Sequence, residues 1–404
     1  MTARSLLVAT LATLLAACGS SSTPTGTAGT AKVNVRLVDA PTLDYTHVLI
    51  TVRDVQIQSD AGWTVLGTVN ETIDLLALQN GAFKTLALDA ELPPGHYGQM
   101  RLTLSTDPGA INKVVFEDGT SADLTIPSGF QTGIKIPVSF DLQAGTTYEI
   151  FVDMDANKSI FVHQAGASGK YILRPVVHAY DRMMTGTISG TLAIPDLATA
   201  TRYDVQVIAQ TVGGDLQPSF ARSVTAGRDG KYTLSLLPID RTYVVAVQPV
   251  IYGDTTTWSY APKASAGIPL ATATPTGTWN ETFTGGVVIP GTGRVSGSVA
   301  TVAQENQYDV AQARLPIGAG GGPLIVRSSD GAVTSDSGGT PVSETYAFAG
   351  LPPSADYTFA IERFTTVPGT YESSAKLSPV KPQAVAAGDD VPLDFLDGFL
   401  PPAP

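Results

Sequence analysis

Hydrophobic and polar residues alternate in several stretches of the first half of the chain. Apolar side chains hold every second position at 33–37, 100–104, 134–142 and 148–154, with mostly polar side chains between them. A period of two with one polar face is typical of antiparallel strands that bury one side. The pattern therefore predicts a β-sandwich. The segment 73–78 fits either a strand or a single helical turn.

Two positions in this pattern predict local irregularities. The apolar residues are at even positions as far as Val52 and at odd positions from Val55 onward. One continuous register cannot keep both sets on the same face, so we predict a β-bulge near Arg53 and Asp54. Pro137 lies among the outward positions of its stretch. Because proline has no N–H for a ladder, Pro137 indicates an edge strand.

The second half of the chain contains a duplicated pattern. GTISGTLAI at 186–194 corresponds to GRVSGSVAT at 293–301, and GKYTLSLLPIDRTYVVAV at 230–247 corresponds to ETYAFAGLPPSADYTFAI at 344–361. Each copy reads as a strand, a Leu-Pro turn and a strand that begins near a tyrosine. A repeat of this size predicts two copies of one sandwich domain rather than a solenoid.

These patterns predict an all-β protein. We expect three tandem β-sandwich domains of immunoglobulin-like or transthyretin-like type after a lipoprotein signal peptide. The expected boundaries are a signal peptide at 1–17, a lipidated cysteine with a polar, flexible tether at 18–31, and sandwiches at 32–182, 183–291 and 292–404.

The first residues have the layout of a secretory signal. Arg4 is followed by an apolar run at 6–17, which is shorter than the roughly 20 apolar residues of a membrane span. Leu-Ala-Ala-Cys at 15–18 resembles the lipobox of bacterial lipoproteins. The resemblance implies cleavage before Cys18, a diacylglycerol on its thiol, and acylation of the new amine by palmitate or a similar chain. By the same family rule, Gly19 favours the outer membrane. The alternative is an ordinary secretion signal with an incidental cysteine.

Composition and charge narrow the classes of function. A net charge of −12 argues against nucleic acid as a partner and against electrostatic binding to anionic lipid. A hydrophobic content of 43% supports packed cores. Cys18 is the single cysteine. Once its thiol carries lipid, the chain has no disulfide, no thiolate metal site and no cysteine nucleophile.

An ordered set of motifs in the first sandwich carries a resemblance to a known family. The motifs are DAP at 39–41, VLITV at 48–52, IDLLALQNG at 73–81, LPPGHYGQMRL at 92–102, DLTIPSGFQTGIKIPVSFDL at 123–142, VDMDANKSI at 152–160 and YILRPVVHAY at 171–180. They resemble domain of unknown function family 4382, which is usually found on secreted lipoproteins. The resemblance implies a cell-surface β-sandwich and brings no assigned reaction and no site residues.

The duplicated half is similar to carboxypeptidase regulatory-like domains. The pattern DGKYTL, LP and TYVVAV at 229–247 carries this resemblance. It implies seven-stranded, transthyretin-like sandwiches. The chain departs from that family after the opening strand, where IPDLATATRYDVQV at 194–207 replaces the usual Gly-rich segment.

Two groups of residues are candidates for binding. Asp153, Asp155 and Asn157 place oxygen ligands at alternate positions, as at the start of a calcium loop, although Lys158 stands where an EF-hand has glycine. The alternative is that they are outward side chains of a strand. The second group consists of Tyr252, Trp258 and Tyr260. These rings can stack on sugars if they are exposed, or belong to a core.

The sequence supports two hypotheses of function. The favoured one is a non-enzymatic, lipid-anchored cell-envelope protein of the outer membrane. It binds a glycan, peptide or partner protein, or acts as a structural surface module, and calcium is the one cofactor considered. The alternative is a calcium-dependent or carboxylate-based hydrolase accessory or enzyme of the cell surface. The four histidines have no metal-ligand spacing, and no catalytic motif favours the alternative.

Overall fold

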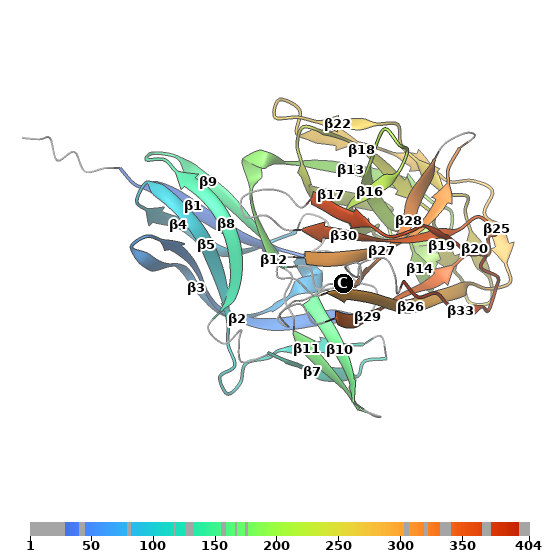
Figure 1. Cartoon of the computed structure of the whole chain (residues 1–404), viewed down its shortest axis with the longest axis horizontal. Helices are drawn as coiled ribbons and strands as arrows, with labels where there is room; N and C mark the ends of the chain where they lie inside the picture. Colours follow the sequence, from blue (N-terminus) through green and yellow to red (C-terminus); the bar gives the residue numbers. More distant parts are fainter. Residues whose placement is uncertain are drawn as a thin grey trace, which may run out of the picture.

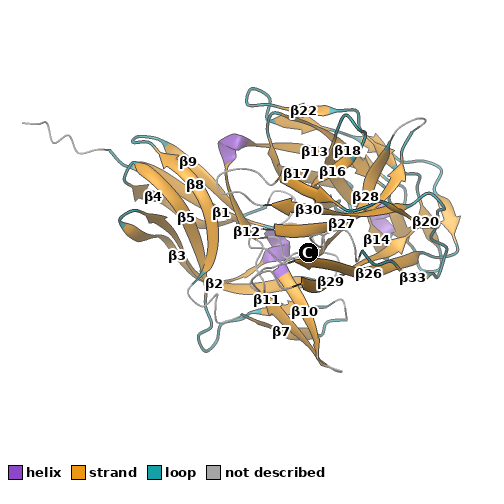
Figure 2. Cartoon of the chain, in the orientation of Figure 1, coloured by secondary structure: helices purple, strands orange, loops and turns teal. Residues whose placement is uncertain are grey.

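The chain folds as an all-β protein in the computed structural model (Figures 1 and 2). The structure describes residues 29–39, 45–78, 82–116, 118–126, 133–154, 159–165, 168–173, 177–302, 307–318, 322–331, 341–365 and 373–395. Short 3-10 turns occur at η1 (Leu75–Leu78), η3 (Arg182–Met184) and η4 (Leu197–Thr199). Within these ranges no helix has the length and hydropathy that crossing a bilayer requires. The expected fold class is therefore confirmed.

Domain one, our name for the segment 31–181, consists of two sheets packed face to face. Its strands are β1 (Ala31–Val38), β2 (His47–Ser59), β3 (Gly62–Asp74), β4 (Lys84–Leu92), β5 (Gly95–Leu104), β6 (Lys113–Val115), β7 (Ser121–Thr125), β8 (Ile134–Leu142), β9 (Thr147–Met154), β10 (Ile160–Ala165), β11 (Ser168–Leu173) and β12 (Val177–Asp181). One sheet has the order β12-β9-β1-β4. The other has the order β10-β11-β7-β6-β2-β5-β8, with β3 paired to β2. The apolar residues of the alternating stretches form the core between them.

The predicted irregularities are present in domain one. The register of β2 against both β3 and β5 shifts between Val52 and Asp54, which confirms the bulge. The shift lets Val52 and Val55 both be fully buried in spite of their opposite parity. Pro137 lies on β8, the last strand of its sheet, as expected of an edge strand. The ambiguous segment divides: β3 ends at Asp74 and η1 follows it.

Domains two and three, our names for 185–289 and 293–392, share one arrangement of strands. The strands of domain two are β13 (Thr185–Ala193), β14 (Arg202–Asp204), β15 (Gln206–Val212), β16 (Pro218–Thr225), β17 (Lys231–Pro238), β18 (Arg241–Val247), β19 (Val250–Tyr252), β20 (Thr257–Ser259), β21 (Lys263–Ala264), β22 (Ile268–Leu270), β23 (Thr276–Thr278), β24 (Glu281–Thr282) and β25 (Val287–Ile289). Those of domain three are β26 (Gly293–Val302), β27 (Gln307–Pro316), β28 (Pro323–Gly331), β29 (Pro341–Leu351), β30 (Thr358–Thr365), β31 (Ser373–Leu377), β32 (Lys381–Pro382) and β33 (Asp390–Pro392).

The strand orders show the duplication directly. In domain two the smaller sheet is β17-β13-β23 and the larger is β16-β15-β18-β21, with β22 also on β18. In domain three the corresponding orders are β29-β26-β33 and β28-β27-β30-β31, with β32 also on β30. Domain two carries one further sheet, β14-β19-β20-β25. The sequence repeat is thus a repeat of topology.

The glycine and tyrosine that recur in both copies have a common structural role. Gly190 lies opposite Tyr232 in the β13–β17 register, and a Cβ on Gly190 would lie 1.8 Å from the carbonyl oxygen of Trp279. The Tyr232 hydroxyl donates to that same carbonyl at 2.7 Å. Only a residue without a side chain allows this close approach. The same arrangement recurs in domain three at Gly297, Tyr346 and Leu393.

Domain three lies against domain two through their larger sheets. Strand β28 contacts β15, β16 and β18. A small apolar cluster is shared by the two domains and consists of Ile208, Phe220, Val310, Ile325 and Phe364. The second and third sandwiches are therefore packed together rather than strung on a linker.

Candidate functional site

The structure describes some of the residues that the sequence singled out and not others. Cys18, Asp155 and Asn157 lie outside the described residues. Asp153 lies near the end of β9, on the face turned away from the core of domain one, and is only 4% exposed. The expectation of a solvated outward side chain at Asp153 is wrong, because domain two covers this face of the sheet.

Asp153 forms an ion pair with Arg222 of domain two. The guanidinium donates from Nη1 to Oδ2 at 2.5 Å and from Nη2 to Oδ1 at 3.2 Å. Both side chains are largely shielded from solvent, with relative exposures of 5% and 14%. Two parallel charge-assisted bonds fix orientation as well as distance. This pair therefore joins domain one to domain two, and a cation bound by Asp153 would have to displace Arg222.

The three aromatic candidates have different surroundings. Tyr260 is 3% exposed, packs edge-on to Phe283 at 6.1 Å and donates to the Pro195 carbonyl at 3.3 Å. Stacking of a sugar on Tyr260 is excluded in this conformation, because the ring is in the core. Trp258 is half-buried and packs against the same core.

Tyr252 is half-buried and lies at the contact between domains two and three. The Arg202 guanidinium lies 4.9 Å from the centre of its ring. Burial and the nearby Asp204 raise the pKa of Tyr252, and the hydrogen bond to Thr292 opposes them. Tyr252 and Arg202 line a hollow of about 240 Å³ between the two domains. Tyr252 is thus the aromatic candidate that borders this hollow.

The described part of the chain has no group of three or more His, Cys, Asp or Glu side chains that could hold a metal ion. Two of the histidines pair with single carboxylates near the surface: His47 Nδ1 lies 2.6 Å from Asp74, and His96 Nδ1 lies 2.9 Å from Asp141. These pairs belong to neighbouring strands of domain one and do not converge on a common point.

Sequence reasoning missed the polar joint between domains two and three. Two glutamines on β15 bond to the free backbone edge of β28. The side chain of Gln210 donates to the Ile325 carbonyl at 3.2 Å and accepts from the Ile325 N–H at 2.8 Å. Gln206 makes the same pair of bonds with the backbone of Ser328, at 3.3 and 2.9 Å. The two amides thus satisfy an edge strand that would otherwise invite pairing with another chain.

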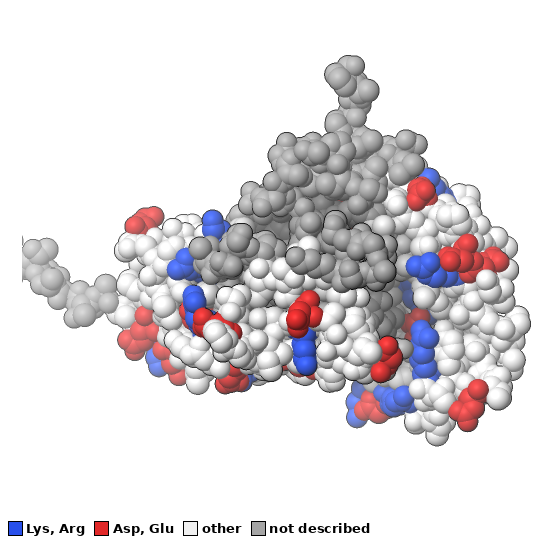
Figure 3. Space-filling model, turned by 90° about the horizontal axis from the view of Figure 1, so that it is seen from below, with Lys and Arg blue, Asp and Glu red and all other residues white. Residues whose placement is uncertain are grey.

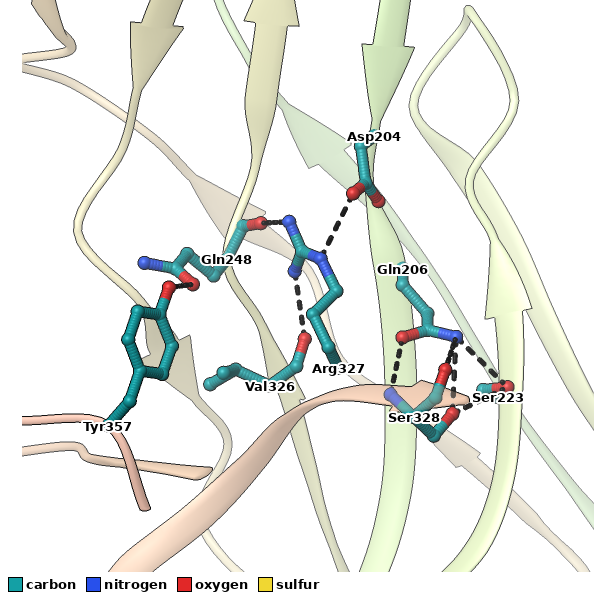
Figure 4. Close-up of polar contacts among 8 residues, drawn as sticks. All are labelled: Asp204, Gln206, Ser223, Gln248, Val326, Arg327, Ser328 and Tyr357. Atoms are coloured by element: carbon teal, nitrogen blue, oxygen red, sulfur yellow. Dashed lines mark hydrogen bonds and ion pairs between the residues drawn. The ribbon is translucent and has the colours of Figure 1, made fainter. Parts of the chain in front are cut away.

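Arg327 inserts from domain three into domain two beside Gln206 (Figure 4). Its Nε donates to Asp204 at 3.0 Å, and its Nη2 donates to the Gln248 carbonyl at 2.9 Å. The Tyr357 hydroxyl donates to the side chain of Gln248 at 3.3 Å. Burial raises the pKa of Tyr357 to about 12. Both members of the Arg327–Asp204 pair are almost completely buried. This cluster fixes the register of one sandwich against the other.

A second buried cluster of the joint is centred on Glu362. Its carboxylate accepts from the Ser219 hydroxyl at 2.6 Å, the Phe220 N–H at 2.9 Å and the Gln312 amide at 2.5 Å. Arg314 is fully buried beside it and donates from Nε to Gln312 at 2.8 Å. Burial lowers the pKa of Arg314 to about 10, against the opposing charge of Glu362, so Arg314 is a cation at neutral pH.

A signal for this joint is present in the sequence. Gln206 and Gln210 interrupt the mostly apolar stretch 205–212. In domain three, polar residues at outward positions interrupt the strands, namely Gln312, Arg314 and Glu362. An outward polar residue on a strand normally faces water. Sequence alone cannot distinguish a solvated outer face from one that a second domain covers.

A second hollow lies between domains one and two, and Val38, one of its lining residues, is the neighbour of Asp153 in the β1–β9 register. Its volume is about 340 Å³. Domain one contributes Arg36, Phe83 and Phe151, the connecting turn η3 contributes Arg182, and domain two contributes mainly small residues with hydroxyl groups. The hollow therefore combines aromatic surface, positive charge and hydroxyl groups at one joint.

The charged side chains of the exposed face in Figure 3 form small mixed groups. Basic and acidic residues alternate there, and much of the described surface between them is uncharged. Such a face has no large field of one sign to steer a strongly charged partner.

Residues 30–175 match the family Domain of unknown function (DUF4382), which confirms the resemblance expected for the first domain. No curated protein matches the chain.

Several solved structures show distant similarity. The Bacillus anthracis TIE protein has a TM-score of 0.17 and 6% identity over 89% of this chain and 49% of that chain, so this chain spans about half of its length. A candidate adhesin from Bacteroides ovatus has a TM-score of 0.16 and 11% identity over 45% and 72% of the two chains. The fimbrial anchor protein Mfa2 from Porphyromonas gingivalis has a TM-score of 0.15 and 12% identity over 47% and 82%.

Proposed function

We propose that this chain is a non-catalytic cell-envelope protein whose three sandwiches form one rigid unit that binds an extracellular glycan, peptide or protein. The observation that carries the proposal is that buried charged side chains form bonds between domains. Asp153, Arg222, Asp204, Arg327 and Glu362 all bond one domain to another. A catalytic site needs such groups poised beside a reacting atom in an accessible cleft. Here they hold the domains in place.

The anchor is part of the proposal. A diacylglycerol on Cys18 and an acyl chain on its amine hold the chain to the outer membrane, because two or more acyl chains give stable anchoring where one is marginal. Residues 19–30 then separate the anchor from domain one. The carboxypeptidase regulatory-like character of domains two and three also belongs to the proposal, and their shared strand order supports it.

The anchor is tested by labelling cells with a palmitate analogue and separating their membranes. We expect the wild-type chain to carry the label and to sediment with the outer membrane. Cys18→Ser loses both properties, and Ser20→Ala, a matched change in the tether, keeps both. A Cys18→Ser chain that still sediments with membranes would show that the anchor is not a lipid on this residue.

The non-catalytic character is tested with the purified full chain on panels of polysaccharides and peptides. We expect binding without turnover. Turnover of any panel member that survives repurification of the chain would overturn the proposal.

The second candidate is a calcium-dependent or carboxylate-based accessory or enzyme. The Asp153 carboxylate is the observation that bears on it, because Arg222 already occupies that carboxylate. If millimolar calcium raises the melting temperature of the full chain, and Asp153→Ala or Asp155→Ala abolishes the rise, this second candidate gains over the first. If calcium leaves the melting temperature unchanged, the calcium site is ruled out.

A further inference from the structure

The cavity between domains one and two combines three kinds of surface that no domain provides alone. On β1 and β9, Arg36 and Phe151 are direct neighbours in the parallel register, on the face turned away from the core. On β13 and β23, Thr187 and Thr276 are neighbours in the same way on domain two. The cavity thus lies between the outer faces of two sheets. Its volume of about 340 Å³ is within the roughly 300–1,000 Å³ of small-molecule sites.

Both charged residues that line this cavity are arginines, in a chain whose net charge is −12. The Arg36 Nε donates to Glu149 at 2.8 Å, and the described contacts give its two terminal nitrogens no partner. The side chain of Arg182 is exposed, and the described residues give its guanidinium no hydrogen bond. The cavity therefore offers guanidinium N–H groups to an anion, and guanidinium is suited to planar carboxylates.

Glu149 keeps Arg36 in position and does not cancel the charge of the site. Burial acts to raise the pKa of Glu149, but the bonds from Asn34 and Arg36 and the charges of Arg36 and Arg182 outweigh it and leave the pKa lowered. Glu149 is therefore ionised at neutral pH. One negative charge then faces two positive ones, so the local balance remains positive.

The aromatic wall is preorganised by Arg36. The Arg36 guanidinium lies 4.3 Å from the centre of the Phe83 ring, and Phe83 is 44% exposed. Phe151 provides a second, half-buried ring. Apolar C–H faces of a ligand can pack on such rings, while polar groups at its edge reach other parts of the wall.

The opposite wall is rich in hydroxyl groups. Thr187, Thr233 and Ser235 are half-buried in the cavity, and the described contacts give their hydroxyl groups no protein partner. Hydroxyl groups both donate and accept, so they suit a ligand that carries several hydroxyls. Leu236 follows Ser235 with φ of +57°, an unusual conformation for leucine, at the point where the register of β17 against β13 shifts.

We propose that this cavity binds an acidic saccharide, with a carboxylate on Arg36 and Arg182, a ring face on Phe83 or Phe151, and ring hydroxyls on Thr187 and Ser235. The inference rests on the proposed function and names its ligand class. An aliphatic or aromatic carboxylate would use the arginines and rings but leave the hydroxyl wall unpaired. A neutral sugar would leave the arginines unused.

The test is calorimetric titration of the full detergent-solubilised chain with digalacturonate and diglucuronate, and with the methyl esters of both. We expect saturable binding of at least one acid, and a dissociation constant for its neutral ester that is higher by about tenfold or more. Added salt should weaken the binding of the acid. Arg182→Gln is exposed and should keep the wild-type melting temperature while it weakens binding by about tenfold. Arg53→Gln, an exposed arginine on β2 in the sheet of domain one that does not line the cavity, should leave binding unchanged.

A third variant probes the hydroxyl wall separately from the charge. Thr187→Val keeps the side-chain shape and should weaken binding by about threefold to tenfold. No binding of either acid at millimolar concentration would overturn the inference, as would equal binding by the Arg182→Gln chain or by benzoate. These outcomes leave the lipid anchor and the absence of turnover untouched, so failure of this inference is distinguishable from failure of the proposed function.

Discussion

Glu362 provides the sharpest test of the joint between domains two and three. It is 2% exposed, and its carboxylate accepts three hydrogen bonds, two of them from Ser219 and Phe220 of domain two. Glu362→Ala leaves these donors unpaired and leaves Arg314 as a buried cation without its nearest opposite charge. Hydrogen bonds to a charged group contribute about 1.5–3 kcal/mol each, but their losses are not additive. Removing one partner of a buried charge pair costs about 3–5 kcal/mol, and we expect a loss in this range.

The positions of the tryptophans make it possible to measure whether domains two and three unfold together. The three tryptophans are Trp63 in domain one and Trp258 and Trp279 in domain two, so domain three has none. In a Trp63→Phe background, tryptophan fluorescence during denaturation in guanidinium chloride therefore reports domain two. If the joint couples the two sandwiches, Glu362→Ala in domain three moves the fluorescence transition of domain two to lower denaturant concentration.

The control is Asp356→Ala, which removes an exposed carboxylate of domain three and should leave the midpoint within the error of measurement. Glu362→Gln keeps the shape and part of the acceptor capacity, so its effect should be intermediate. If Glu362→Ala leaves the domain-two transition at the wild-type midpoint, the two sandwiches unfold independently, and the reasoning from the buried contacts is refuted.

Three further predictions concern other parts of the molecule. In Gly297→Ala the new Cβ would lie 2.0 Å from a backbone carbonyl oxygen, so we expect thermal denaturation to show a loss of stability of about 1–3 kcal/mol. The control Gly214→Ala should leave the stability unchanged, because its Cβ would have nothing within 4 Å. Because burial raises the pKa of Tyr357 from 10.0 to about 12, the unfolded chain loses the Tyr357 proton at lower pH than the folded chain does. The contribution of the protonated hydroxyl to the free energy of unfolding is therefore fully present below about pH 10 and is lost as the pH rises to about 12. Burial also raises the pKa of Tyr232, Tyr243 and Tyr346, so the share of Tyr357 is read as a difference between two proteins: denaturation curves at successive pH values should show a loss over this window that is about 3 kcal/mol smaller in Tyr357→Phe than in the wild type. Arg222→Ala leaves Asp153 buried without its cation, so it should lower the free energy of unfolding by about 3 kcal/mol and increase the radius of gyration in X-ray scattering. Arg222→Lys should recover part of both effects. An unchanged radius in Arg222→Ala would show that other contacts hold domains one and two together.

Much of the local structure could be predicted from local pattern. Val52 is at an even position and Val55 at an odd one, so both can face the same core only if a bulge lies between them. The structure has that bulge. The repeated motif around Gly190 and Gly297 indicated a duplicated sandwich, and both glycines lie where a carbonyl approaches the backbone. These features depend on neighbours within a strand or on its adjacent partner, so a few residues of sequence contain the information.

The candidate sites were less predictable. Asp153 looked like an outward strand residue or a calcium ligand, and its partner is Arg222, on another domain. The sequence left Tyr260 open between sugar stacking and a core position, and it is in a core. In each case the side chain's type was known and its surroundings were not, because those surroundings come from segments distant in the sequence.

By itself, the sequence determined the all-β class, the strand alternation, the bulge and the duplication, because a period of two and a Gly-Tyr repeat act over short distances. Only the tertiary structure decided that the outer faces of the sheets are not all solvated. It placed Gln210, Glu362 and Arg314 in a buried joint and brought Arg36 and Thr187 to opposite walls of one cavity. The physical reason is that a polar residue on an outer strand face can be satisfied by water or by a second domain, and the same pattern in the sequence serves both.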